Sequence, residues 1–92
     1  MIAKRLRIHG LVQGVGYRQW MVGRATRLLV AGWVRNRGDG TVEAFVEGDA
    51  AAVEELLRAC RRGPQAASVT LIHEDLAEPD ELAGFEARAS AP

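Results

Sequence analysis

Two glycines and an arginine stand close together near the N-terminus, in the segment 13–18, which reads Gln-Gly-Val-Gly-Tyr-Arg. Glycines free the backbone of such a loop to turn its N–H groups toward one point, and a concave set of N–H groups binds an anion. The apolar spacing from Tyr17 onward predicts a helix, and the N-terminus of a helix also attracts negative charge. A tight turn without a ligand is the alternative, and the glycines alone favour it.

Arg18 adds a reason to expect an anion. It falls in the first turn of the predicted helix, where the helix dipole is positive and a cation is unfavourable by up to about 1 kcal/mol. An anion bound between Arg18 and the preceding loop would reverse the sign of that interaction. Because a guanidinium fork suits phosphate and carboxylate, we interpret Arg18 as a candidate ligand for one of these groups.

Asn36 is the second candidate for chemistry. It alternates with Val34 in a predicted strand, so we expect its side chain on the buried face near the strand end. A buried amide in a small core needs a hydrogen-bond partner or a function. The alternative is that Asn36 bonds the backbone of the adjacent turn, Gly38-Asp39-Gly40, and strand alternation does not decide between the two.

Hydrophobic periodicity places these candidates at the ends of regular elements. Alternation predicts a strand over residues 4–12, and helical spacing follows from Tyr17 to about Leu29. Gly23 inside this helix costs about 1 kcal/mol relative to alanine, and we expect close packing to explain it. The predicted apolar faces are Leu6, Ile8, Gly10 and Val12 in the strand and Met21, Val22, Ala25, Leu28 and Leu29 in the helix.

The rest of the chain continues the alternation of strands and helices. Asp49 is a good N-cap for a second helix, whose apolar residues include Cys60, and Gly63-Pro64 ends it. The glycines of the turn at 38–40 favour a hairpin. The other predicted strands span residues 33–37, 41–47 and about 68–75, with a short edge strand at 85–88.

This order, β-α-β-β-α-β with a short final strand, predicts an α+β fold of the ferredoxin-like, split βαβ class. Two helices should cover one face of an antiparallel sheet. The strands that flank each helix should be parallel and not adjacent, with right-handed crossovers. A chain of 92 residues is expected to be a single domain, residues 1–92.

Composition excludes several classes of protein. Hydrophobic residues make up 48% and charged residues 26%, as in an ordinary globular domain. No apolar run could span a bilayer and the N-terminus has no signal-peptide core, so we expect a cytoplasmic protein without membrane contact. Cys60 is the only cysteine, which excludes an internal disulfide and a cysteine-based zinc cluster. His9 and His73 are expected at the surface.

Zero net charge conceals an asymmetry between the two halves. Residues 1–46 carry eight basic and two acidic side chains, a net charge of +6, and residues 47–92 carry four basic and ten acidic ones, a net charge of −6. The halves could simply pair with each other in the fold, which charge alone favours. The basic half could instead attract anionic ligands.

Two longer motifs contain these candidates. Ile8 to Arg18 resembles the first signature of the acylphosphatases, and Gly32 to Val42 resembles the second, with Gly48 following at the usual spacing. The resemblance covers nearly the whole chain, including Gly63-Pro64. It implies the ferredoxin-like fold and an enzyme that hydrolyses acyl phosphates to a carboxylate and inorganic phosphate, without metal or cofactor.

The resemblance also implies roles for individual residues. Arg18 would hold the phosphate together with the backbone amides of the loop, and Asn36 would position and polarise the attacking water. The phosphate-binding loop implied in this way comprises Gln13, Gly14, Val15, Gly16, Tyr17 and Arg18.

The chain departs from the family pattern at two positions. Tyr17 stands where the family usually has phenylalanine, so its hydroxyl needs solvent or a hydrogen-bond partner. Leu29 stands where glycine is usual after the first helix. Leu29 must therefore adopt a costly left-handed conformation or end the helix in another way.

Other functions of this fold fit less well. An RNA-binding version would need base-stacking aromatics in an RNP pattern, and the central strands offer only Phe45 and Trp33 and no such pattern. We interpret Trp20 and Trp33 as packing residues. A metal chaperone would need a Cys-x-x-Cys loop. A domain of a larger maturation factor is a third alternative. We expect a free monomeric enzyme whose partners are a small acyl phosphate and its phosphate product, with no nucleic acid.

Overall fold

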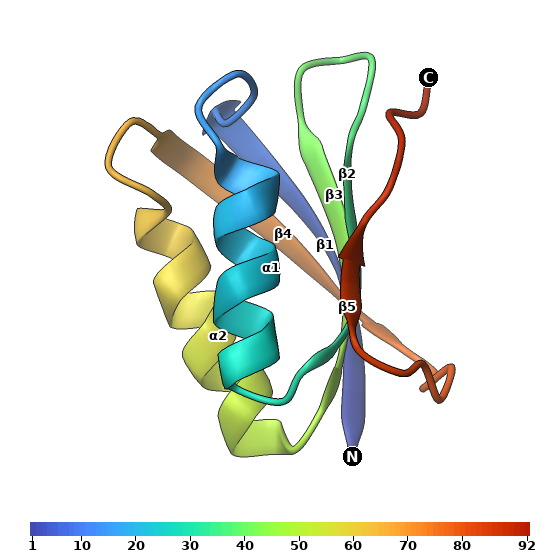
Figure 1. Cartoon of the computed structure of the whole chain (residues 1–92). Coiled ribbons are helices and arrows are strands. Elements are labelled where there is room, and N and C mark those ends of the chain that lie inside the picture. Colours follow the sequence, from blue (N-terminus) through green and yellow to red (C-terminus); the bar gives the residue numbers. More distant parts are fainter.

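The computed structural model describes all 92 residues of the chain, Met1 to Pro92. Five strands form one sheet, and two helices lie over one of its faces (Figure 1). The predicted order of elements is confirmed, including the short final strand. In chain order the elements are β1 (Ile2–Leu11), α1 (Tyr17–Arg27), β2 (Ala31–Asn36), β3 (Val42–Gly48), α2 (Ala50–Arg62), β4 (Ser68–Ala77) and β5 (Phe85–Ala87).

The strands lie in the order β4-β1-β3-β2-β5 across the sheet. β3 pairs antiparallel with both β1 and β2, so the two strands that flank α1 are parallel and have β3 between them. β4 pairs antiparallel with β1, so the strands that flank α2 are separated by β1 in the same way. This is the split βαβ arrangement that the sequence predicts.

The four main strands form the predicted antiparallel sheet, but β5 makes the whole sheet mixed, because it pairs parallel with β2. After β4 the chain crosses the face of the sheet that carries no helix and reaches the opposite edge (Figure 1). A chain that returns after β4 runs opposite to β4, and β2 also runs opposite to β4. The added strand is therefore parallel to its neighbour, and the sheet is mixed.

The main core lies between the sheet and the helices and contains 15 buried residues. Asp49 caps α2 as predicted, because its side chain accepts a hydrogen bond from the N–H of Ala51 at 3.2 Å. Neither helix has the length and hydropathy needed to span a bilayer. The predicted apolar positions that are fully buried are Leu6 and Ile8 in β1, Val12 directly after β1, Met21 and Ala25 in α1, and Val53, Leu56, Leu57 and Cys60 in α2.

Leu29 does not belong to the buried stripe of α1, which corrects the prediction from its spacing. The helix ends at Arg27, and Leu29 adopts a left-handed conformation with φ of 59°. Its N–H donates to the carbonyl of Thr26 at 3.2 Å, and the N–H of Val30 donates to the carbonyl of Ala25 at 2.9 Å. These are the two hydrogen bonds of a Schellman motif. The side chain of Leu29 turns outward and is 87% exposed.

Gly23 is not explained by close packing, contrary to the expectation from the sequence. A Cβ atom built at this position would meet no heavy atom within 4 Å outside the local helix backbone. The glycine therefore weakens α1 without a packing benefit.

The face of the sheet without helices is also covered at its centre. Trp33 and Phe45 stack there with ring centroids 6.4 Å apart, and both are buried, so Trp33 packs as predicted. The carboxylate of Glu47 accepts hydrogen bonds from the N–H groups of Asp80 and Leu82, each at 2.6 Å. These bonds hold the segment between β4 and β5 against this face of the sheet. As a result β3, the central strand, is buried on both faces.

Glu43 forms ion pairs with three arginines on the same face of the sheet, the face without helices. Its carboxylate lies 2.7 Å from Nε of Arg35, 3.2 Å from Nη1 of Arg37 and 3.7 Å from Nη1 of Arg5. Burial by itself would raise the pKa of Glu43, but the hydrogen bond and charge of Arg35, together with the charges of Arg37 and Arg7, lower the pKa below its ordinary value. The carboxylate is therefore charged at neutral pH.

Four of the eight ion pairs lie inside the basic half of the chain, two lie inside the acidic half and two join the halves. Lys4 is the only basic residue of this half that pairs with the acidic half, with Glu54 at 2.9 Å and Glu74 at 3.0 Å. The pairing of the two halves is therefore confined to one lysine. The arginines of α1 form no ion pair, and these are Arg18, Arg24 and Arg27.

Candidate active site

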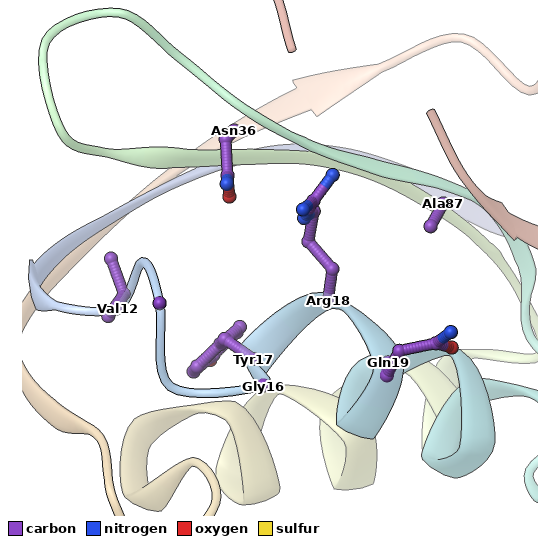
Figure 2. Close-up of a pocket in the computed structure, with 8 residues that line it drawn as sticks. Val12, Gly16, Tyr17, Arg18, Gln19, Asn36 and Ala87 are labelled. Carbon is purple, nitrogen blue, oxygen red and sulfur yellow. The ribbon is translucent and has the colours of Figure 1, made fainter. Parts of the chain in front are cut away.

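A pocket of about 240 Å³ opens where the loop after β1 faces the end of β2. The structure brings Arg18 and Asn36 together here, one from the first turn of α1 and one from the last residue of β2. Figure 2 shows their side chains directed into the same space from opposite sides. The pocket is lined by Val12, Gly14, Gly16, Tyr17, Arg18, Gln19, Asn36 and Ala87.

The loop presents free backbone donors. Gly14 and Gly16 adopt positive φ angles of 73° and 79°, which glycine tolerates without steric cost. Gly16 is the N-cap of α1 and supplies no capping side chain, and the first turn contains no acidic residue. The backbone N–H groups of residues 14–19 donate no hydrogen bond within the protein. A helix start with this many free donors is a site for an anion.

Tyr17 fixes the start of α1 against α2. Its side chain is 1% exposed, and its hydroxyl donates to the carbonyl of Cys60 at 2.7 Å, so the partner that the sequence analysis requires is present. Burial raises the pKa of Tyr17, so the phenol stays neutral and adds no negative charge beside the pocket. Burial also raises the pKa of Cys60 to about 12, which agrees with the prediction of a core thiol.

Arg18 has no carboxylate partner. Its Nη1 donates to the carbonyl of Arg88 at 3.4 Å, which is a long hydrogen bond, and the side chain takes part in no ion pair. The cation therefore lies at the positive end of the helix dipole without compensation from the protein. A bound anion would supply that compensation.

Asn36 has a buried side-chain oxygen, Oδ1, with no hydrogen-bond partner. The alternative that Asn36 stabilises the adjacent turn is wrong, because other groups do so. Oδ1 of Asp39 accepts a hydrogen bond from the N–H of Thr41 at 3.0 Å, and the side chain of Gln13 reaches the same turn. A buried acceptor without a partner requires an explanation, and here it faces the pocket (Figure 2).

Two residues of the predicted loop do not line the pocket. Gln13 turns toward the β2–β3 turn, where its Nε2 donates to the carbonyls of Arg37 and Thr41. Val15 packs against the main core. The pocket also contains residues that the sequence analysis missed, namely Val12, Gln19 and Ala87. The first two flank the loop in sequence, but nothing in the sequence signals that Ala87 meets the loop.

The C-terminal tail, residues 88–92, runs along the edge of β2 (Figure 1). It directly follows Ala87, which lines the pocket. It places the carbonyl of Arg88 near Arg18 and holds the backbone of Asn36 from the side opposite β3. Three backbone hydrogen bonds fix it: the N–H of Arg88 to the carbonyl of Val34 at 2.8 Å, that of Ala91 to Asn36 at 2.9 Å, and that of Gly38 to Ala91 at 2.9 Å.

The donor set of the pocket suits an anion and not a cation. Its lining contains one guanidinium, two primary amides and backbone N–H groups, but no carboxylate, imidazole or thiol that would bind a divalent metal. His9 and His73 lie elsewhere, on the face without helices, with their rings 5.4 Å apart, a contact that sequence reasoning missed. No third potential metal ligand joins them.

Comparison with known proteins places the chain among relatives of one kind. A family model described as Acylphosphatase matches residues 4–87. The chain is 67% identical over 90 residues to a protein named acylphosphatase from Acidiphilium cryptum, an alignment that covers 98% of this chain and 99% of that protein. It is 48% identical over 85 residues to an acylphosphatase from Thermococcus kodakarensis, covering 92% of this chain and 93% of that protein.

Solved structures share the fold. The crystal structure of acylphosphatase from Bacillus subtilis matches with a TM-score of 0.93 at 32% sequence identity, covering 96% of this chain and 99% of that chain. Full-length HypF in its phosphate- and nucleotide-bound form matches with a TM-score of 0.91 at 27% identity, covering 98% of this chain and 12% of that chain. The same fold thus also occurs as a small part of a much longer protein.

Proposed function

The chain belongs to the acylphosphatase family and hydrolyses the carboxyl-phosphate bond of acyl phosphates, and we propose that Arg18, the free amides of the loop and Asn36 perform this reaction. One observation carries the proposal. An acceptor atom without a partner, an arginine without an ion pair and a set of free N–H groups border the same pocket. These are the groups that a phosphate and an attacking water together require.

The substrate's chemistry explains why few groups are needed. An acyl phosphate is a mixed anhydride whose leaving group is a carboxylate, a weak base that departs without a general acid. The transition state of phosphoryl transfer is loose, and its negative charge lies on the equatorial oxygens. Catalysis then reduces to positioning and electrostatic stabilisation. Phosphate monoesters leave as alkoxides and should be poor substrates.

The loop and Arg18 would bind the phosphoryl group. The N–H groups of residues 14–18 are directed by the two glycines, and the guanidinium can donate two parallel hydrogen bonds to phosphate oxygens. These contacts would replace the long hydrogen bond from Arg18 to the carbonyl of Arg88. The charge that develops on the equatorial oxygens would then face a cation and the positive end of a helix.

Asn36 would hold the attacking water. Its Oδ1 is a free acceptor, so a water that donates one hydrogen to it directs an oxygen lone pair toward phosphorus. As the new bond from the water oxygen to phosphorus forms, the bond from phosphorus to the carboxylate oxygen breaks. The water's protons pass to a phosphate oxygen and to solvent. The products are the free carboxylate and inorganic phosphate.

Further properties belong to the same proposal. The pocket's donor chemistry supports a reaction without a metal or cofactor, since its side chains match phosphate directly. We propose a small-molecule acyl phosphate as substrate, without a nucleic-acid or membrane partner. A single domain, residues 1–92, would work as a monomer in the cytoplasm.

Replacement of Arg18 tests the proposal. Arg18→Ala should lower kcat/KM on a small aryl acyl phosphate by about 10²–10³-fold, because it removes a charged transition-state contact. Inorganic phosphate should inhibit the unaltered protein competitively, and Arg18→Ala should weaken this inhibition. Arg58→Ala is the matched control, since Arg58 is an exposed arginine of α2 that makes no side-chain hydrogen bond or ion pair.

Asn36→Ala separates water positioning from phosphate binding. It should lower kcat by a similar factor while phosphate still inhibits at nearly the same concentration, because the loop and Arg18 remain. All assays contain EDTA. Activity that survives Arg18→Ala, or that disappears in EDTA, would contradict the proposal.

A further inference from the structure

Gln13 connects the two sides of the pocket without lining it. It directly precedes Gly14, the first of the two glycines that direct the loop amides. Its Nε2 donates hydrogen bonds to the carbonyls of Arg37 and Thr41, both at 2.8 Å. Arg37 directly follows Asn36 in sequence. The contact therefore joins the start of the phosphate-binding loop to the end of the strand that carries Asn36.

All the hydrogen-bonding groups in this contact, the two N–H groups of Gln13 and the two carbonyl oxygens, have partners. A primary amide nitrogen has two N–H groups, and each finds one carbonyl. The two carbonyls also accept backbone hydrogen bonds that close the turn, Arg37 from Gly40 at 3.2 Å and Thr41 from Arg37 at 2.9 Å. Because each carbonyl oxygen has two lone pairs, the side chain of Gln13 occupies the positions that the turn leaves open. The amide is thus committed to the turn and does not face the phosphate.

The orientation of Asn36 depends on its backbone, because its Oδ1 makes no hydrogen bond of its own. The backbone of Asn36 is held in the sheet by β3 on one side and by the C-terminal tail on the other. Neither β3 nor the tail makes a short side-chain hydrogen bond to the phosphate-binding loop. The bond from Arg18 to Arg88 is the other polar link near the pocket and measures 3.4 Å. The two short bonds of Gln13 are therefore the firm connection between the loop and the strand end.

We infer that Gln13 is a positioning residue that sets the distance between the phosphate-binding amides and the carboxamide of Asn36. The inference rests on the proposed function, in which the amides hold the phosphoryl group and Asn36 holds the water. Rate in such a reaction depends steeply on the approach of the reacting atoms, and a displacement of about 1 Å can cost about 100-fold. Phosphate binding depends on the loop and Arg18 alone, so it should depend little on Gln13.

The experiment compares three variants with the unaltered protein on one aryl acyl phosphate. Gln13→Met keeps the length of the side chain and removes both donors, and Gln13→Asn keeps the amide but shortens its reach. Gln65→Met makes the same chemical change at an exposed glutamine that makes no hydrogen bond and lies outside the pocket. For each protein we would measure kcat, KM, the inhibition constant of inorganic phosphate and Tm, with assays run well below every Tm.

We expect kcat to fall by about 10- to 100-fold in both Gln13 variants, with the phosphate inhibition constant within about threefold of the unaltered protein. Gln65→Met should change none of these quantities. An unchanged kcat in both Gln13 variants would overturn the inference, and so would a parallel loss of kcat and phosphate inhibition, which indicates a phosphate ligand or a disordered site. Absence of acyl phosphate hydrolysis in the unaltered protein would instead refute the proposed function.

Discussion

Single residues decide how the chain leaves α1. A leucine at a left-handed position brings its Cβ too close to the following carbonyl oxygen, at a cost of roughly 1–2 kcal/mol. The left-handed conformation of Leu29 allows the two Schellman hydrogen bonds to the carbonyls of Thr26 and Ala25, and these bonds offset part of the cost. The side chain of Leu29 is almost fully exposed, so little packing offsets the strain.

Leu29→Gly should therefore stabilise the protein. Relief of the strain exceeds the extra entropy of glycine in the unfolded chain, and we expect a net gain of about 0.5–1 kcal/mol. For a domain of this size, that gain corresponds to a rise in Tm of roughly 2–8 °C. Thermal unfolding checks it, and an unchanged or lower Tm would count against the strain at this position.

The sequence indicated which residues belong to the candidate site, but not the contacts that position them. Arg18 and Asn36 could be identified because a cation at a helix start and an amide on a buried strand face are both anomalies that the sequence displays. The place of Gln13 could not be predicted. Its partners are the backbone carbonyls of Arg37 and Thr41, and only the folded turn decides which carbonyls lie within its reach.

At the scale of elements, Gly23 makes α1 less stable than an alanine at the same position would. The helix places Arg18 and Tyr17 at the pocket, yet it contains Gly23, whose missing Cβ leaves open space. Glycine in a helix interior is less favourable than alanine because it loses more backbone entropy on folding.

Gly23→Ala should raise the free energy of unfolding by about 0.5–1 kcal/mol without changing kcat or KM. Denaturant unfolding at fixed pH gives the stability, and the aryl acyl phosphate assay gives the kinetics. Destabilisation would mean that α1 moves closer to a neighbouring element than the structure indicates.

Periodicity predicted every strand and helix but not the direction of the last strand. Apolar alternation reports that a strand exists and which of its faces is buried, whereas pairing partner and direction depend on where the connecting chain leads. Here Glu47 holds the returning segment across the sheet through the N–H groups of Asp80 and Leu82. A buried glutamate that accepts two backbone hydrogen bonds from a distant loop leaves no pattern in the sequence.

At the scale of the whole molecule, the charge asymmetry has little to do with pairing between the halves. Arg5, Arg35 and Arg37 share Glu43 within the basic half, whereas Arg18 lies unpaired in the pocket and Arg24 and Arg27 lie unpaired in the last turn of α1. A positive region of this kind favours the approach of an anionic substrate.

Glu43 should make the stability of the protein sensitive to acid. Its pKa is lower in the folded protein than its ordinary value of 4.5, so its stabilising contribution is complete above about pH 4.5 and is lost as the pH falls through the lower folded value. Glu43→Gln should cost about 2 kcal/mol at pH 7, because it removes charged hydrogen bonds to the arginines.

Denaturant unfolding between about pH 3 and pH 7 checks this prediction. The stability of the unaltered protein should fall more steeply below about pH 4.5 than that of Glu43→Gln, so the two curves should converge in acid. Asp39 and Glu54 also have lowered pKa values, but they are present in both proteins and cancel in the difference. Parallel curves would contradict the role of Glu43.

The C-terminal tail has a practical consequence for anyone who purifies or immobilises this protein. Ala91 bonds the backbone of Asn36 and of Gly38, so the last residues of the chain lie beside the pocket. The N-terminus lies at the opposite end of the molecule (Figure 1). An affinity tag or surface linkage at the C-terminus would crowd the pocket and strain the tail, whereas the same attachment at Met1 would leave the pocket open to substrate.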